Sequence, residues 1–296
     1  TSTEAETTKS YTSVGVYTVT LAATGDGGVS SATLDINVIS ASLYFIDSSD
    51  ELIQKILLDG TNTVSLVKDV ATMSGVGIAF DEVNNKIFFS DFYDADTPDG
   101  KIWKMNLDGT GSVAIASGIL DPYGIALDAP GGKIYWTDDN GNISKANLDG
   151  TSPQTLFSVD GGGMRAIALD KINNKMYFYE VQNDNLYKAN LDGTNAEVFM
   201  TGVYGYALAV DTANQKLYFD DQYGPALKSV NLDGTGVVTI DNTDTRIYGI
   251  AIDYEINKLY WSGRDVGEIY VANLDGSSKT TVATGLSSPR GLFLKK

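Results

Sequence analysis

Neither histidine nor cysteine occurs among the 296 residues of this chain. The absence of histidine excludes a Ser-His-Asp triad, a histidine general base and any histidine-ligated metal. The absence of cysteine excludes thiol catalysis, zinc-thiolate sites and disulfide bonds. The sequence also lacks an apolar run of about 18 residues, which is the length that a membrane-spanning helix needs. We therefore predict no membrane insertion.

Positive charge is scarce as well, because 21 lysines and arginines stand against 38 acidic residues and the formal net charge is −17. A surface this acidic repels phosphate backbones and anionic lipids, so nucleic acid is not an expected partner. Hydrophobic residues nevertheless make up 43% of the chain. That share is enough to build a large buried core, so we expect a folded protein.

A repeated Leu-Asp-Gly string organises most of the sequence. Successive copies lie 41 to 49 residues apart, with their aspartates at Asp59, Asp108, Asp149, Asp192, Asp233 and Asp275. A period of this length without a helical pattern predicts one four-stranded sheet per repeat, which is the blade of a β-propeller.

The third repeat shows the expected strands. An aliphatic run (123–128) and an aromatic run (133–138) are followed by two alternating segments (142–148 and 154–157). The Asp-Gly pair between the alternating segments indicates a tight hairpin, because glycine tolerates a positive φ. The first two runs are apolar on both faces, as strands between neighbouring blades must be.

The ends of the chain predict how the ring closes. Six aromatic second strands are present, but only five innermost strands precede them in sequence. We expect the sixth to be the segment 290–294, paired with 43–46, so that the C-terminal strand completes the first blade. The fold class is therefore all-β, with a six-bladed propeller over residues 41–296 and no free sheet edge at the closure.

Two segments identify the repeat. The strings Ile134-Tyr-Trp-Thr-Asp138 and Leu259-Tyr-Trp-Ser262, each followed by Asn-Leu-Asp-Gly, resemble the YWTD repeats of low-density lipoprotein receptor class B. The resemblance implies a six-bladed propeller, an extracellular or cell-surface location, and protein ligands on the top face. Gly263 departs from the motif, which has aspartate there. Because the chain has no cysteine for the EGF-like module of animal members, it looks more like a secreted or surface protein of bacteria or archaea.

The first 40 residues have a different pattern. Alternating apolar residues over 9–21 and 31–38 flank a glycine-rich turn. This pattern resembles the C-terminal part of a PKD domain, an immunoglobulin-like β-sandwich. Two or three strands cannot bury a sandwich core alone, so we expect residues 1–40 to be one end of a longer chain of modules. The alternative is a hairpin that packs on the propeller.

Candidate ligand-binding residues occupy the position before each innermost strand, which should surround the channel at its top. Apart from Val76, these positions hold Tyr123, Arg165, Tyr206, Tyr248 and Arg290. Tyrosine and arginine are favoured at binding hot spots. The sequence therefore predicts a recognition surface for a ligand with an acidic or planar group. The alternative is that these side chains only plug the channel.

One loop is longer than its equivalents and is rich in carboxylates. Asp94, Asp96 and Asp99 precede Gly100 within this loop. Calcium prefers several oxygen ligands, so the loop is a candidate calcium site, although a solvated acidic loop is the alternative. The aspartates that recur in the aromatic strands, such as Asp138, are interpreted as structural, because a residue repeated in most blades usually serves the blade.

The leading functional hypothesis is a non-catalytic binding or structural module of an extracellular or cell-surface protein. It would recognise a protein, peptide or glycan on its top face, in adhesion or extracellular assembly, alongside further modules of the same parent chain. Six-bladed propellers also include calcium-dependent lactonases and related hydrolases, so an enzyme is the first alternative. A ligand-free structural spacer is the second.

Overall fold

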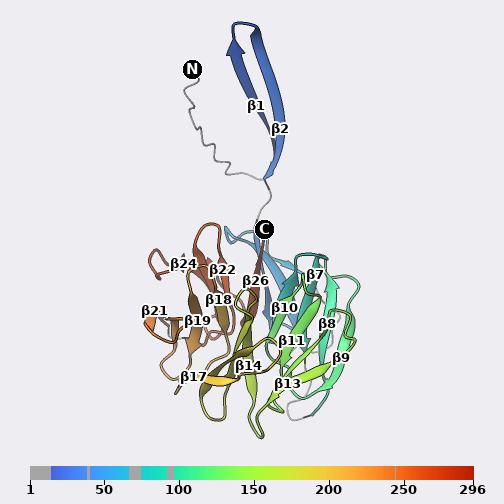
Figure 1. Cartoon of the computed structure of the whole chain (residues 1–296), viewed down its shortest axis with the longest axis vertical. Helices are drawn as coiled ribbons and strands as arrows, with labels where there is room; N and C mark the ends of the chain where they lie inside the picture. Colours follow the sequence, from blue (N-terminus) through green and yellow to red (C-terminus); the bar gives the residue numbers. More distant parts are fainter. Residues whose placement is uncertain (1–14, 39–40, 67–74, 92–96, 244) are drawn as a thin grey trace.

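The computed structural model describes residues 15–38, 41–66, 75–91, 97–243 and 245–296. Within these residues the secondary structure is entirely β, and no helix has the length and apolar character of a membrane span. Six four-stranded antiparallel sheets are arranged around a common axis, and a two-stranded sheet lies outside them (Figure 1). The all-β six-bladed propeller expected from the repeat is confirmed.

Each of blades 2 to 6 consists of four strands that are consecutive in sequence and follow one another from the channel to the periphery. Blade 2 comprises β6 (Ile78–Asp81), β7 (Lys86–Asp91), β8 (Gly100–Asn106) and β9 (Val113–Ile119); blade 3 comprises β10 (Ile125–Asp128), β11 (Lys133–Thr137), β12 (Asn142–Asn147) and β13 (Gln154–Ser158); blade 4 comprises β14 (Met164–Asp170), β15 (Lys175–Glu180), β16 (Asn185–Asn190) and β17 (Glu197–Thr201). Blade 5 comprises β18 (Leu208–Asp211), β19 (Lys216–Asp221), β20 (Ala226–Asn231) and β21 (Val238–Asn242); blade 6 comprises β22 (Ile250–Asp253), β23 (Lys258–Gly263), β24 (Glu268–Asn273) and β25 (Thr280–Ala283).

Blade 1 closes the ring with strands from both ends of the propeller. The C-terminal strand β26 (Pro289–Lys295) is innermost and pairs with β3 (Ser42–Asp47), which is followed by β4 (Leu52–Leu57) and β5 (Val64–Ser65). Leu292 lies opposite Phe45 in this antiparallel pair, as the closure prediction required. The Asp47 carboxylate adds to the closure by accepting the N–H groups of Ser287 and Ser288, at 3.0 and 2.6 Å.

The hydrophobic core lies between the blades and not within them. Each of the six buried clusters combines side chains from two adjacent sheets. Between blades 2 and 3, for example, Phe88 and Ile102 pack with Ile134 and Trp136. The inner strands therefore bury both faces, which explains why their sequences are continuously apolar.

The Leu-Asp-Gly turns lie at the periphery, where they contact the neighbouring blade. In blade 3, the Asp149 carboxylate accepts the N–H of Thr151 at 2.9 Å, and Gly150 has a φ of 85°. A Cβ on Gly150 would lie 2.0 Å from the carbonyl oxygen of Ile115 in blade 2. This position therefore needs glycine for its backbone conformation and also for the close contact between the blades.

The two-stranded sheet is an amphipathic hairpin of β1 (Gly15–Gly25) and β2 (Gly28–Val38), drawn beyond the propeller in Figure 1. Its register places Val19 opposite Leu34 and Leu21 opposite Ala32 on one face. Thr18 lies opposite Asp35 on the other face and donates a 2.6 Å hydrogen bond to it. The apolar face is open to solvent, with Leu21 73% and Leu34 67% exposed. Among the described residues, packing of this face on the propeller, the alternative from the sequence, is not observed.

Candidate functional site

The top face of the propeller is the side on which loops lead into the innermost strands. The predicted ligand-binding residues converge there at the channel mouth. We call this set, which comprises Tyr123, Arg165, Tyr206, Tyr248 and Arg290, the tyrosine–arginine ring. Aromatic contacts connect its members: the rings of Tyr206 and Tyr248 stack with centroids 4.2 Å apart, and those of Tyr123 and Tyr206 lie 6.2 Å apart.

Arg165 occupies one side of this ring. Its guanidinium carbon lies 3.9 Å from the centroid of Tyr123 and 5.8 Å from that of Tyr206, and the guanidinium forms an ion pair with Asp139. Burial alone would lower the pKa of Arg165, but the neighbouring Tyr123 and Asp139 raise it above its usual value. The cation is thus held over two aromatic faces, an arrangement that stabilises both the charge and the ring orientation.

Three further residues, two tyrosines and one arginine, adjoin the tyrosine–arginine ring and were not predicted from the sequence. The hydroxyl of Tyr204 hydrogen-bonds that of Tyr206, and the two rings meet edge to face at 5.4 Å. The exposed Tyr223 packs on Tyr204 at 6.0 Å. Arg264 places its guanidinium carbon 5.2 Å from the Tyr248 centroid. Arg264 follows β23 and Tyr223 follows β19, so these loops, and not only the loops before the innermost strands, build the site.

The buried side chain of an aspartic acid holds the backbone at the start of the Tyr206 segment. Asp220, which is only 1% exposed, accepts the N–H groups of Tyr206 at 2.8 Å and Ala207 at 2.7 Å. Burial raises the pKa of Asp220 to about 7 despite these hydrogen bonds. The equivalent position in blade 3 is Thr137, whose hydroxyl accepts the N–H of Gly124. The sequence contains a signal for this difference, because blade 5 has an aspartate at the position where blade 3 has a threonine.

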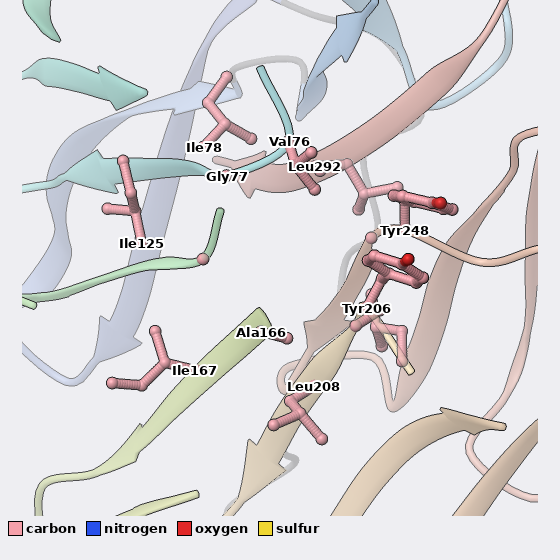
Figure 2. A pocket seen from close by; sticks show the side chains of 15 residues that line it. Val76, Gly77, Ile78, Ile125, Ala166, Ile167, Tyr206, Leu208, Tyr248 and Leu292 are labelled. Carbon is pink, nitrogen blue, oxygen red and sulfur yellow. The ribbon is translucent and has the colours of Figure 1, made fainter. Parts of the chain in front are cut away.

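The channel below the tyrosines encloses a cavity of about 160 Å³. Figure 2 shows aliphatic side chains around it, among them Ile125, Ile167 and Leu208, with Tyr206 and Tyr248 stacked at one side. The remaining lining residues are glycine, alanine, valine, leucine and isoleucine. Among the described residues, the side chains that line this cavity are therefore aliphatic or tyrosyl, and none of them carries a carboxylate or a carboxamide.

The repeated acids of the aromatic strands serve the blades, as expected. Asp138 accepts the N–H of Asn142 at 3.0 Å, and Asp221 accepts that of Tyr223 at 3.1 Å. Asp91 is buried, and burial raises its pKa to about 7. These hydrogen bonds confirm the structural interpretation of the motif for the blades in which they occur.

The calcium candidate is only partly within the described residues, since Asp94 and Asp96 lie outside them. Asp99 is in the turn before β8, where its N–H donates to the carbonyl of Thr97 at 2.9 Å. Over the described part of the chain, the structure holds no group of three or more acidic side chains arranged for a metal ion. Calcium binding by this loop stays a prediction.

Comparison with known proteins agrees with this architecture. Residues 132–171 match the family profile of the low-density lipoprotein receptor repeat class B. Low-density lipoprotein receptor-related protein 5 of Mus musculus is 49% identical over 63 residues, which are 21% of this chain and 4% of that protein. Protein cueball of Drosophila grimshawi is 27% identical over 125 residues, or 40% of this chain and 20% of that protein. The chain thus spans a small part of the relatives it matches.

Solved structures share the fold. The nidogen/laminin complex contains a chain that superposes with a TM-score of 0.74 at 21% identity, covering 86% of this chain and 98% of that one. TolB from Acinetobacter baumannii gives a TM-score of 0.69 at 11% identity, covering 86% of this chain and 66% of that one. At these identities the likeness concerns the fold alone.

Together, these observations define a six-bladed β-propeller, one repeat of which matches a known family profile. The particular repeat matched at 132–171 is that of low-density lipoprotein receptor class B. The relatives found by sequence come from mouse and fruit fly. The expectation of a bacterial or archaeal source therefore gains no support from them.

Proposed function

We propose that this chain is a non-catalytic binding module of an extracellular or cell-surface protein, and that it recognises a protein ligand through the tyrosine–arginine ring. The observation that carries the proposal is the convergence of three tyrosines and two arginines at one channel mouth. Large, rigid aromatic and guanidinium groups contribute most of the free energy at protein interfaces. Peptide and glycan ligands on the same face are the other forms that this recognition would take.

The comparisons support the same class of function. The mouse relative is named a receptor-related protein, and the structural neighbour nidogen is found in a complex with laminin. By analogy, we assign this propeller to recognition in extracellular assembly or adhesion. The analogy concerns a class of role, and the ligand of this chain is defined by its own top face.

The experiment is a binding screen of the purified chain against arrays of extracellular proteins and glycans, with and without calcium. A variant in which Tyr123, Tyr206 and Tyr248 are replaced by alanine is screened in parallel. We expect at least one protein ligand whose affinity falls tenfold or more in this variant. Tyr254→Ala is the matched control, because Tyr254 follows β22 at the end opposite to Tyr248 and is 60% exposed. Ligands that bind both proteins equally would refute the proposal.

The amphipathic hairpin supports a second, separate proposal about residues 1–40. We propose that they belong to an immunoglobulin-like sandwich of the PKD type. The support is the division of the hairpin into one apolar face, which includes Val19 and Leu34, and one threonine-rich face. One face of a sandwich strand packs on the opposing sheet while the other meets solvent. Proteolysis of the longer parent protein tests the proposal: protection of the hairpin is expected, and cleavage at the rate of the isolated chain would contradict it.

A further inference from the structure

A second group of contacts lies on the top face between blades 4 and 5, outside the tyrosine–arginine ring. Tyr223 packs on Tyr204 with ring centroids 6.0 Å apart and ring planes at 45°. The hydroxyl of Tyr223 also donates a 2.6 Å hydrogen bond to Oδ2 of Asp184. Two tilted aromatic rings and a carboxylate are thus brought together by the loops that follow β15, β17 and β19. We call Asp184, Tyr204 and Tyr223 the rim cluster.

Backbone hydrogen bonds fix these three loops to one another. The N–H of Val203 donates to the carbonyl of Asp184 at 3.0 Å. The N–H of Gln222 donates to the carbonyl of Tyr204 at 2.7 Å. The loops are therefore held in place before a ligand arrives, which reduces the conformational entropy that binding costs.

The rim cluster combines open aromatic surface with a negative charge. Tyr223 is 64% exposed, so most of its ring is available for contact. Its hydrogen bond to Asp184 raises the pKa of Tyr223, as expected for a hydroxyl that donates to an ionised carboxylate. Among the described residues, no lysine or arginine forms an ion pair with Asp184, whereas Asp221 in the same loop as Tyr223 is paired with Lys228 at 2.6 Å.

A planar cation fits both features of the cluster. The face of an aromatic ring attracts cations, and a guanidinium group stacks on such a face while its N–H groups donate to a carboxylate. Tyr223 donates to Oδ2 of Asp184, and no donor to Oδ1 is found within the described residues. An ammonium group has the charge but not the flat surface for stacking, so arginine fits better than lysine. The net charge of −17 would also attract a cationic ligand to the protein.

We propose that Asp184, Tyr204 and Tyr223 form a subsite for an arginine side chain of the protein ligand. This inference rests on the proposed function, since it names a residue type that the ligand presents to the top face. Tyr204 connects the subsite to the tyrosine–arginine ring, because it meets Tyr206 edge to face at 5.4 Å. The ligand would thus contact the channel mouth and place its arginine between blades 4 and 5.

Nuclear magnetic resonance titration of the whole chain at low salt tests the subsite. The probe is the blocked tripeptide N-acetyl-Gly-Arg-Gly-amide, and the ring signals of Tyr204 and Tyr223 are the readout. We expect millimolar binding that weakens about fivefold in Asp184→Asn and about threefold in Tyr223→Ala. Asparagine tolerates the φ of 55° at position 184, so the first variant keeps the backbone. Tyr223→Phe retains the ring and should bind as the wild type does.

The control variant is Asp160→Asn, which makes the same change of charge. Asp160 is exposed in the loop that leads into β14 on the same face. It should leave binding of the tripeptide unchanged, because the proposed contact is local. A loss equal to that of Asp184→Asn would assign the binding to the overall charge of the protein and would overturn the subsite.

Two further outcomes would contradict the inference. One is an equal response to the same tripeptide with citrulline in place of arginine, since citrulline has the shape of arginine without its charge. The other is full binding by both Asp184→Asn and Tyr223→Ala, with thermal melts showing that they are folded. Tighter binding of the lysine tripeptide would likewise refute recognition of a guanidinium group.

The inference and the proposed function fail separately. A protein ligand from the screen that depends on the three tyrosines but binds Asp184→Asn and Tyr223→Ala at full strength would refute the subsite and leave the proposed function standing. Binding of the arginine tripeptide at the rim cluster without any tyrosine-dependent protein ligand would do the opposite.

Discussion

Asp220 allows a quantitative prediction about stability and pH. Replacing it by asparagine keeps the size of the side chain and an oxygen that accepts the N–H groups of Tyr206 and Ala207. The new amide nitrogen would face the side chain of Gln222, whose Oε1 has no hydrogen-bond partner within the described residues. Rotation of the Gln222 amide would let this oxygen accept from the asparagine. The variant therefore removes the ionisable proton with little change in packing.

The magnitude follows from the raised pKa. Burial raises the pKa of Asp220 from its usual value of 3.8 to about 7. Between these values the folded protein holds a proton that the unfolded chain has lost, so the free energy of unfolding falls as pH rises through this window. Each pH unit contributes about 1.4 kcal/mol. Between pH 5 and pH 8 the wild type should lose about 3 kcal/mol at this site, whereas Asp220→Asn should lose none there.

Urea unfolding of both proteins at a series of pH values provides the measurement. Other groups that titrate in this range, such as Asp91, contribute equally to both proteins and cancel in the difference. We expect the stability of Asp220→Asn relative to wild type to increase by about 3 kcal/mol from pH 5 to pH 8 and then to level off. A difference that stays constant over this range would refute the assignment of a buried, protonated carboxyl group beneath Tyr206.

Two further predictions concern the contacts that hold the six blades together in a closed propeller. Gly150→Ala should reduce the free energy of unfolding by about 3 kcal/mol, because its Cβ would meet the carbonyl of Ile115 and its φ is positive. Gly132→Ala, where φ is also positive but the space around the Cβ is open, should cost only about 1 kcal/mol. Equal costs for the two variants in urea unfolding would contradict the blade contact. Deleting residues 289–296 removes β26 and should abolish the cooperative calorimetric transition of the full chain; an unchanged melting temperature would show that closure does not depend on this strand.

The propeller was predictable from sequence because each of its determinants is local or repeated. The Asp-Gly turns and the doubly apolar inner strands recur at nearly constant spacing, so one blade explains the others. The positions before the innermost strands are equivalent by repetition, which is why Tyr206 and Tyr248 could be placed in one ring. Their stacking depends on side-chain rotamers that the repeat does not encode.

The rest of the site could not be predicted for the same reason. Arg264 lies in a loop after a second strand, and these loops differ in sequence from blade to blade. Its approach to Tyr248 depends on the path of that loop and on the capture of Asp265 by Arg246. The hairpin shows a related limit: its strands alternate clearly in sequence, but alternation does not say what covers the apolar face.

The central claim is that the tyrosine–arginine ring binds a protein. Isothermal titration of the strongest protein ligand from the array screen tests it most directly, with wild type, Tyr206→Ala and Tyr254→Ala compared under one set of conditions. The account predicts that Tyr206→Ala weakens binding about thirtyfold, as a hot-spot residue does, and that Tyr254→Ala leaves it unchanged. Equal affinity of wild type and Tyr206→Ala would contradict the claim.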